Sequence, residues 1–466
     1  MSSAQSQAQE HGERLFKPLK SLTMVLVALN PAMAFSSFGS FSNNLAAVSQ
    51  RSGSRAPCPI AKCVAVIAGP TGVGKSDLAL RLCEQMQGEI ISVDSVQVYR
   101  NLVIGANKPT AKELERVPHH LLNVCESNEE YTAGDFYKDA LQAVEDVLSR
   151  GRLPILVGGT SMYLDWFTNG RPHAPMADPV VKNQVRELLS PFKEANDWEN
   201  GLAKLQEVDP ESASKLVRND WYRLHRALTI AMQTKDSTES PPSPAEKDDL
   251  TKLRDSLDMR CFFLSAPREE LFRRIDRRCE AMLQSGLLEE TTEQLLDGTL
   301  LPSSAAGRAI GYRQTIEYLT RKKWRYQAPS PLSQFVKGFA TQSRQYAAKQ
   351  TRWFRTEQNF EWVPVDWELP EAAERTLIEH IQCDREEFDR ALAAPCQAEL
   401  REQDRNDKST ETYLPHLPNT IDKRAACDEL LARADNCREQ LQDYLQKLRD
   451  IDAELAERYP YTRSRA

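Results

Sequence analysis

Residues 69–76 read Gly69-Pro70-Thr71-Gly72-Val73-Gly74-Lys75-Ser76, and this stretch decides the fold. It fits the P-loop pattern, in which a glycine and four further residues are followed by Gly-Lys and a serine or threonine. The preceding residues 63–68 are apolar and rich in β-branched side chains, and residues 76–86 carry apolar side chains at helical spacing. The order of strand, glycine loop and helix predicts an α/β fold with a parallel sheet.

The residue types of this loop suit a diphosphate or a triphosphate. Backbone amides of such a loop, together with the N-terminus of the following helix, attract phosphate oxygens. Lys75 would neutralise phosphate charge, and the Ser76 hydroxyl would reach a bound Mg²⁺, the one cofactor we expect. A glycine-rich turn without a ligand is the alternative, and both flanks argue against it. The residues expected to bind phosphate are Gly69, Thr71, Gly72, Val73, Gly74, Lys75 and Ser76.

Length and composition restrict the class of protein. With 466 residues the chain exceeds a usual single core, and we expect about two to three units. Its net charge of −7 argues against general electrostatic binding of a polyanion, so nucleic acid would need local basic patches. The ten cysteines have no Cys-x-x-Cys spacing, which indicates a reducing compartment rather than a disulfide framework or a zinc ribbon.

The N-terminal region predicts a targeting segment. Residues 14–76 contain no acidic side chain, and the apolar stretch 22–35, interrupted by Pro31, is too short for a comfortable membrane span. Ala32-Met33-Ala34-Phe35 and a serine-rich basic segment follow, an order that resembles a bipartite plastid presequence. We therefore expect residues 1–60 to be a disordered plastid presequence, with a mitochondrial leader as the alternative, and a mature protein without a membrane segment.

Two further strands run toward the same edge of the expected sheet. Residues 89–94 predict a strand that ends in Asp94, and ligands of open α/β sheets lie beyond the carboxyl ends of the strands. Asp94 is therefore a candidate magnesium ligand or general base, or only the N-cap of the next segment. Residues 153–160 predict a further strand that ends in Gly158 and Gly159. This strand lacks the terminal aspartate of a Walker B motif, which argues against an ATPase.

Several segments together resemble the tRNA dimethylallyltransferases, also called tRNA isopentenyltransferases. They cover residues 62–365 in the family's order, and each is weak alone but specific in combination. The matching segments are 69–76, 91–95 with Gln97 and Tyr99, 105–109, 157–160, Arg223 within 219–223, and 309–314. The resemblance implies a P-loop NTPase-like core and transfer of a dimethylallyl group from dimethylallyl diphosphate to the exocyclic amine of adenosine 37 in tRNA, forming N6-isopentenyladenosine (EC 2.5.1.75).

The resemblance also implies roles for individual residues. Asp94 would be the general base, which helps because the lone pair of the adenine amine is delocalised into the ring. Lys75 and Arg223 would be catalytic cations that stabilise the leaving diphosphate. By pattern alone, Arg223 could instead belong to the solvated face of a helix. The family commonly has proline where this chain has Trp221.

The implied partner is a tRNA anticodon stem-loop, bound by a monomer. Ser95, Val96 and Gln97 beside Asp94 would read the edge of an extruded adenine. The pattern of residues 335–355 predicts a helix with an aromatic face and with a basic face of arginines that point away from it. Basic helix faces are commonly only solvated. The arginines expected to contact RNA are Arg308, Arg313, Arg344 and Arg352.

The chain divides into a core, an insertion and an extension. We expect a presequence (1–60), a first core part (61–177), a helical insertion (178–218), a second core part with a disordered linker at 234–252 (219–365), and a C-terminal extension (366–466) with a coiled-coil-like helix (421–458). By resemblance the insertion grips the anticodon stem. Arg273, Arg274, Arg277 and Arg278 form either a phosphate-facing patch or a solvated surface. The cysteines and histidines of the extension lack zinc-finger spacing, so we expect no zinc.

Other functions predict different ligands. An adenylate isopentenyltransferase of cytokinin synthesis would use free AMP, ADP or ATP, but the helical insertion and residues 310–314 favour the tRNA branch. A nucleoside kinase would transfer phosphate from ATP, and an RNA-binding protein with a vestigial loop would show no turnover.

Overall fold

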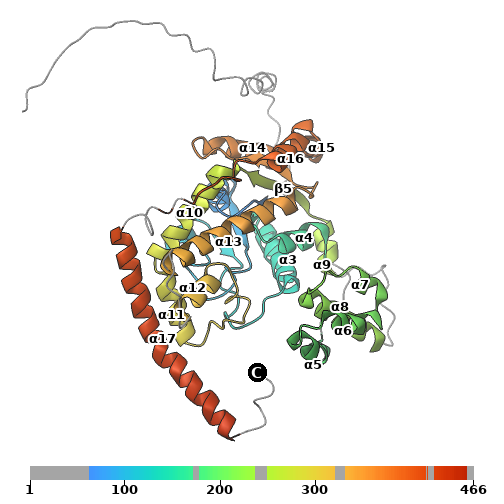
Figure 1. The fold of residues 1–466 in the computed structure, drawn as a ribbon. Coiled ribbons are helices and arrows are strands. Elements are labelled where there is room, and N and C mark those ends of the chain that lie inside the picture. The colour runs from blue at the N-terminus through green and yellow to red at the C-terminus, as the bar shows by residue number, and fades with distance from the viewer. Residues whose placement is uncertain are drawn as a thin grey trace, which may run out of the picture. The chain divides into compact units, whose positions relative to one another are not determined.

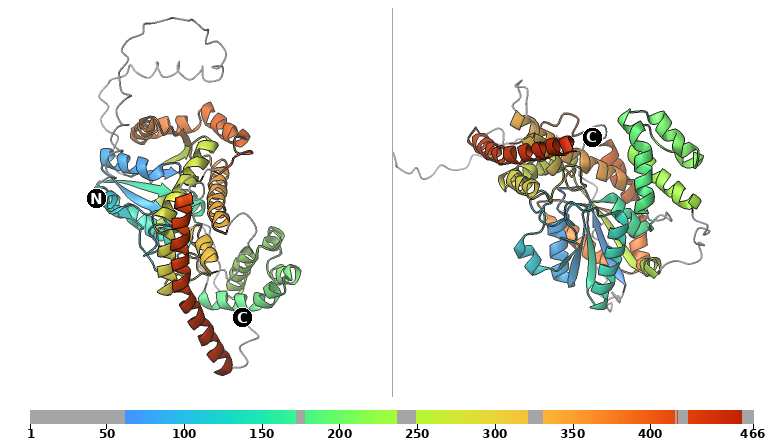
Figure 2. Two further views of the ribbon diagram at one scale, coloured as in Figure 1. Left: turned by 60° about the vertical axis from the view of Figure 1, so that its left-hand side comes forward. Right: turned by 90° about the horizontal axis from the view of Figure 1, so that it is seen from below.

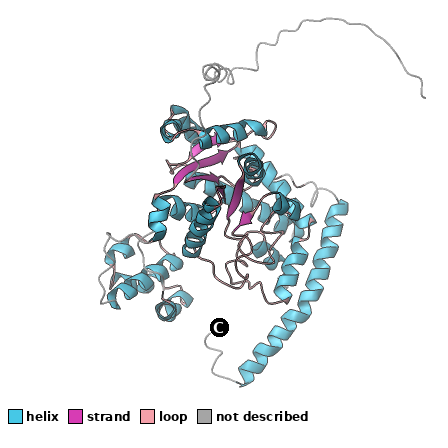
Figure 3. Ribbon diagram, turned by 180° about the vertical axis from the view of Figure 1, so that it is seen from behind, coloured by secondary structure: helices cyan, strands magenta, loops and turns pink. Residues whose placement is uncertain are grey.

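The computed structural model describes residues 62–171, 178–236, 249–320, 331–415, 417 and 424–458. Its centre is a six-stranded sheet in the order β3-β2-β4-β1-β5-β6, and all pairings among these strands are parallel. The strands are β1 (Cys63–Ala68), β2 (Gly88–Val93), β3 (His119–His120), β4 (Leu153–Gly158), β5 (Asp258–Ser265) and β6 (Glu361–Pro364). Helices surround the sheet (Figure 3). The predicted α/β fold with a parallel sheet is confirmed.

Strand register brings three loops together. Ala68 at the end of β1 is opposite Gly158 at the end of β4, and Gly158 is also opposite Val93 at the end of β2. The P-loop, Asp94 and Gly159 each follow directly after one of these residues. The register therefore places them at one edge of the sheet.

The alternation along β1 shows that both faces of the sheet are buried. Cys63, Ala65 and Ile67 belong to one hydrophobic cluster, whereas the intervening residues Val64, Val66 and Ala68 belong to another. The first cluster includes side chains of α1 (Lys75–Met86), α10 (Arg268–Gln284) and α13 (Pro331–Phe354). Helices α10 and α13 lie side by side (Figure 1). The second includes α3 (Ala133–Ser149), which begins after a Thr132–Asp135 capping box, and α4 (Ser161–Asn169).

The helical insertion has a hydrophobic core of its own. It comprises α5 (Pro179–Glu194), α6 (Trp198–Gln206), α7 (Pro210–Ser214) and α8 (Trp221–Asp236). The cluster extends past the expected boundary at 218, because Leu224 and Leu228 of α8 are buried in it. Trp221 packs edge-on against Trp198, with 5.2 Å between the ring centres. The tryptophan found where the family commonly has proline is thus part of this core.

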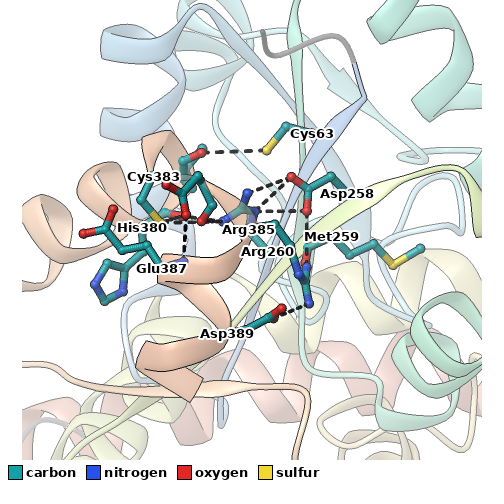
Figure 4. A network of polar contacts seen from close by, with 11 residues as sticks. Cys63, Asp258, Met259, Arg260, His380, Cys383, Arg385, Glu387 and Asp389 are labelled. Carbon is teal, nitrogen blue, oxygen red and sulfur yellow. Dashed lines mark hydrogen bonds and ion pairs between the residues drawn. The ribbon is translucent and has the colours of Figure 1, made fainter. Parts of the chain in front are cut away.

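The C-terminal extension packs on the catalytic core. Helices α14 (Pro370–Gln382), α15 (Arg385–Leu392) and α16 (Pro395–Asn406) follow β6. The guanidinium of Arg260, a buried β5 residue, donates to Asp258 and to the carbonyls of His380 and Asp384 (Figure 4). His380 Nδ1 lies 2.7 Å from the buried Glu361 carboxylate on β6. These polar contacts attach the extension to the sheet.

The last helix, α17 (Arg424–Arg458), begins near the expected residue 421. Leu430, Ala434, Cys437 and Leu441 are buried in the first cluster, beside α11 (Leu287–Leu296) and α12 (Tyr312–Thr320) (Figure 2). Of the two expected arrangements, the structure therefore shows a helix packed on the body. Among the described residues, every helix is too short or too polar to cross a bilayer. The expected presequence and most of the expected linker lie outside the described residues.

Candidate active site

The P-loop closes around the ammonium group of Lys75. Gly72 and Gly74 have positive φ angles of 86° and 104°, a backbone region that favours glycine, and Gly74 is the N-cap of α1. Lys75 Nζ donates to the carbonyls of Gly69 (2.9 Å) and Pro70 (3.0 Å). The ammonium is therefore held inside the concave side of the loop.

The electrostatic environment of Lys75 is short of negative charge. The pKa of Lys75 is lowered to about 7, mainly by burial and also by the positive charge of Arg278, whereas the negative charge of Asp94 opposes both effects. A bound polyanion would add the missing negative charge and restore the protonated form of Lys75. The site thus favours a ligand with several negative charges.

Asp94 has the capping role that its sequence position left open, and it also faces a cavity. Its Oδ1 accepts hydrogen bonds from the backbone N–H groups of Val96 (2.8 Å) and Gln97 (3.3 Å), so it caps the turn after β2. Its side chain also lines a cavity shared with Thr71 of the P-loop and with Ser95 and Val96. The capping role is confirmed, and the catalytic role stays a prediction that this position permits.

The cavity at this edge of the sheet has a volume of about 330 Å³. Asp94, Arg278 and Arg308 are its charged lining residues, and Ile275 and Met282 of α10 together with Phe339 of α13 contribute apolar wall. The lining residues are Thr71, Asp94, Ser95, Val96, Tyr99, Gly105, Ala106, Tyr131, Ile275, Arg278, Cys279, Met282, Ala305, Arg308, Ala309, Ile310, Phe339, Ser343 and Tyr346. Such a cavity suits a ligand with an anionic end and an apolar or aromatic body.

Of the four arginines at positions 273, 274, 277 and 278 of α10, two face the P-loop. Arg278 Nη1 donates to the Thr71 hydroxyl (2.6 Å), and Arg274 Nε donates to the Gly72 carbonyl (3.2 Å). Arg273 instead pairs with Glu269, and Arg277 is exposed. The sequence left open whether these arginines face phosphate or solvent. Arg274 and Arg278 both face the loop because their i, i+4 spacing places them on one side of the helix.

Gln350 of α13 was missed by sequence reasoning. Its Oε1 accepts from the Thr71 amide (2.9 Å), and its Nε2 donates to the Gly159 carbonyl (2.8 Å). A Cβ at Gly159 would collide with this side chain. The buried amide therefore ties the P-loop to the loop after β4. The Tyr346 hydroxyl interacts with Gln350 and Thr160, and burial together with the charge of Asp94 raises its pKa to about 12.

Within residues 309–314, Ala309 and Ile310 line the cavity directly, whereas Tyr312 acts on it through a loop. The Tyr312 hydroxyl donates to Glu290 (2.6 Å), and the carboxylate of Glu290 also accepts from the backbone amides of residues 103–105. Gln97, which does not line the large cavity, donates from its side chain to the carbonyls of Ala106 (3.3 Å) and Asn107 (3.0 Å). These contacts hold the loop that contributes Gly105 and Ala106 to the cavity wall.

The other predicted residues occupy different environments. Arg308 lines the cavity, while Arg313 and Arg352 are exposed. The expected outward position of Arg344 is wrong. Its guanidinium is buried against the fully buried Asp276, whose other oxygen accepts from the Tyr413 hydroxyl (2.8 Å). The helical wheel could not include α10 and the C-terminal extension, which cover this face of α13.

Arg223 lies on the surface of the helical insertion. Its side chain is 69% exposed and pairs with Asp220 (3.0 Å), and it is not among the residues that line the cavity. Its predicted role at the diphosphate stays a prediction.

Ser76 provides the kind of oxygen ligand that Mg²⁺ prefers. Its exposed side chain, at the start of α1, lines a smaller cavity of about 100 Å³. The described residues contain no group of three or more histidine, cysteine or acidic side chains suited to enclose a metal. A Mg²⁺ ion held by one hydroxyl, water and phosphate oxygens fits this donor set, because Mg²⁺ commonly binds proteins together with substrate phosphates.

Comparison with known proteins gives consistent results. The family model described as IPP transferase matches residues 97–357. The tRNA dimethylallyltransferase 9 of Arabidopsis thaliana is 41% identical over 333 residues, which are 64% of this chain and 71% of the relative. The tRNA dimethylallyltransferase of Protochlamydia amoebophila is 37% identical over 311 residues, 66% of this chain and 86% of the relative. A solved structure of a eukaryotic dimethylallyltransferase acting on tRNA has a TM-score of 0.53 at 26% identity, covering 71% of this chain and 84% of its own.

The pKa of Lys75 predicts pH-dependent binding of inorganic diphosphate. Because the lowered pKa is about 7, Lys75 loses its charge as the pH rises through 7, and the anion must then bind together with a proton. We expect the affinity to fall about tenfold from pH 6.5 to 8.5 relative to Lys75→Arg, whose guanidinium stays charged. Calorimetric binding experiments with both proteins measure this difference. The protonation of diphosphate itself changes with pH in the same way for both proteins, so it cancels in the comparison. Parallel pH profiles for the two proteins would contradict the assignment.

Proposed function

This chain belongs to the IPP transferase family and is a tRNA dimethylallyltransferase, and we propose that the cavity between the P-loop and Asp94 is where the transfer takes place. The observation that carries the proposal is that Asp94, Thr71 and Arg278 line one cavity with apolar walls. This arrangement puts a carboxylate beside an anion-binding loop, with room for an allyl chain and a nucleobase between them.

The P-loop would hold the diphosphate of dimethylallyl diphosphate. Lys75, the loop amides and Arg278 place positive charge where negative charge grows as the bond between C1 and the diphosphate oxygen breaks. Preorganised donors of this kind contribute about 3 kcal/mol each to the transition state. Mg²⁺, when bound at Ser76, would add further positive charge to the leaving group.

Asp94 would act on the adenosine amine. As the new bond between N6 and C1 forms, the amine loses a proton, and the Asp94 carboxylate would accept it. Two backbone N–H groups hold its Oδ1, so the orientation of the carboxylate is set before substrate arrives. Ile275, Met282 and Phe339 line the same cavity and would keep water from the allylic carbon.

The tRNA would reach the cavity with its target base extruded. Ser95 and Val96 line the cavity next to Asp94 and would contact that base, whereas Gln97 would act by holding the neighbouring loop. Arg308 lines the cavity with an exposed side chain, and Arg313 and Arg352 are exposed, which supports phosphate contacts by these three. We propose that a monomer binds the anticodon stem-loop.

Two arginines are candidates for the second cation. Arg278 already donates to Thr71, while Arg223 would have to exchange Asp220 for the diphosphate when substrates bind. We expect Arg278→Gln and Arg223→Gln each to lower kcat/KM for dimethylallyl diphosphate by about 100-fold. Initial-rate kinetics at saturating stem-loop check this, and an unchanged value for Arg223→Gln would remove that residue from the site.

Replacement of Asp94 tests the proposed chemistry. Asp94→Asn keeps the size of the side chain and an acceptor for the turn, but an amide is not a general base. We expect kcat to fall about 10²–10⁴-fold while stem-loop affinity changes less than twofold. Mass spectrometry of nucleosides from an anticodon stem-loop measures the transfer, and AMP is the competing acceptor. Preference for AMP would support the adenylate isopentenyltransferase instead, and full activity of Asp94→Asn would exclude Asp94 as the base.

We further propose that residues 1–60 direct the protein to a plastid. The acid-free composition of residues 14–76 and the Ala-x-Ala-Phe sequence after a short apolar stretch support this. Residues 1–60 fused to a fluorescent protein are expected to reach plastids, and the same fusion with Phe35→Ala is the control for the motif. Arrival in mitochondria would select the alternative.

A further inference from the structure

The C-terminal extension contacts the P-loop from outside the cavity. Trp367, which lies ten residues beyond the segment matched by the family model, donates from its indole Nε1 to the carbonyl of Val73 (3.0 Å). The Arg274 guanidinium lies 4.6 Å from the centre of the same indole ring, and its Nε donates to the carbonyl of Gly72. Two consecutive carbonyls of the phosphate loop are thus bound by side chains on its outer side.

Because of the geometry of the peptide bond, the hydrogen bond from Trp367 to the Val73 carbonyl also restricts the orientation of the N–H group on the other side of that peptide. In a planar trans peptide the C=O and N–H groups point in opposite directions. The carbonyl of Val73 shares its peptide plane with the N–H of Gly74, so an indole that fixes this carbonyl outward also turns that N–H toward the concave side. Gly74 has φ 104°, and its freedom to rotate would otherwise be large.

The same extension also holds the helix that follows the loop. Glu374 of α14, which is buried, accepts from Arg81 Nε of α1 (2.6 Å) and from Gln85 of the same helix. Trp367 and Glu374 are only seven positions apart, and Pro370 starts α14 between them. This short segment therefore contacts both the phosphate loop and α1, whose N-terminus adjoins the loop.

Packing alone does not explain the placement of Trp367. The indole is partly buried against the first hydrophobic cluster, as an ordinary aromatic residue would be. Its N–H group, however, is directed at a loop carbonyl, and its ring face is covered by an arginine that donates to the preceding carbonyl. A cation over an indole face is a favourable pair that fixes the ring orientation. The N–H group is consequently held in one position relative to the loop.

We propose that Trp367 is a positioning residue for diphosphate, which acts by orienting the Val73–Gly74 peptide so that the Gly74 N–H faces the leaving group. The C-terminal extension then contributes to donor binding in this enzyme without touching the donor. The inference rests on the proposed binding of diphosphate in the P-loop and adds a residue outside the family-matched segment to that site.

The test distinguishes the effect of the Trp367 indole N–H group from the effect of its ring. Trp367→Phe keeps an aromatic ring under Arg274 but has no donor for the Val73 carbonyl. We expect the Kd for inorganic diphosphate and the KM for dimethylallyl diphosphate to rise about fivefold, the value for one lost hydrogen bond. The KM for the stem-loop should change less than twofold, and a melting temperature close to that of the wild type would show that the fold is intact.

The matched control lies in the same extension. His380→Gln removes the contact with Glu361 on β6 and leaves the P-loop contacts in place, so we expect it to keep the donor KM of the wild type. If Trp367→Phe does not fold, Arg274→Met tests the same outer contacts by removing the cation over the indole and the donor to Gly72. It should raise the diphosphate Kd in the same way.

The outcomes distinguish this inference from the proposed function. If wild-type protein binds diphosphate and prenylates the stem-loop while both variants keep its Kd and KM, the inference is wrong and the function stands. Equal rises in the KM for donor and for stem-loop, or a similar effect of His380→Gln, would mean that Trp367 acts only through general stability. If the wild type does not bind diphosphate, the proposed function itself fails.

Discussion

Parallel pairing of β1 with β4, and of β4 with β2, is the constraint on which the site depends. Ala68, Gly158 and Val93 are opposite one another at the ends of these strands. Because strand side chains alternate, a shift by one residue would exchange the side chains of β1 between the two faces of the sheet. The two hydrophobic clusters oppose such a shift, since each takes alternate residues of β1. Burial of the sheet on both faces thus fixes where the P-loop, Asp94 and Gly159 meet.

The resulting site has more positive than negative charge. Lys75, Arg278 and Arg308 lie at the P-loop or line the cavity, and Asp94 is the acidic side chain among the cavity-lining residues. The lowered pKa of Lys75 is the consequence, because burial and the neighbouring arginine both disfavour its charged form. A diphosphate bound there would remove this imbalance, so its binding would be coupled to the protonation of Lys75. A single acidic group is also what the reaction needs, since one proton leaves the adenosine amine.

The side chains that hold the P-loop come from segments far apart in sequence. Helix α10 supplies Arg274 and Arg278, α13 supplies Gln350, and the extension supplies Trp367 on the outer side of the loop. Arg274, Gln350 and Trp367 form hydrogen bonds with backbone groups of the P-loop. Arg278 instead donates to a side chain, the Thr71 hydroxyl. The loop is therefore held by hydrogen bonds to its peptide groups. Such an arrangement keeps the inner N–H groups available for an anion.

The sequence by itself determined the local elements and the chemistry of the loop. The P-loop, the strands β1, β2 and β4 and the α17 helix follow from periodicity and from residue types that act within a few positions, and the resemblance identified the family. Tertiary structure alone decided which arginines meet the loop and which are buried. Arg344 and Arg278 are both arginines on amphipathic helices, yet Asp276 and Tyr413 enclose the first, whereas the second reaches Thr71. The physical reason is that a helical wheel gives the direction of a side chain, while its environment depends on which distant segment packs there.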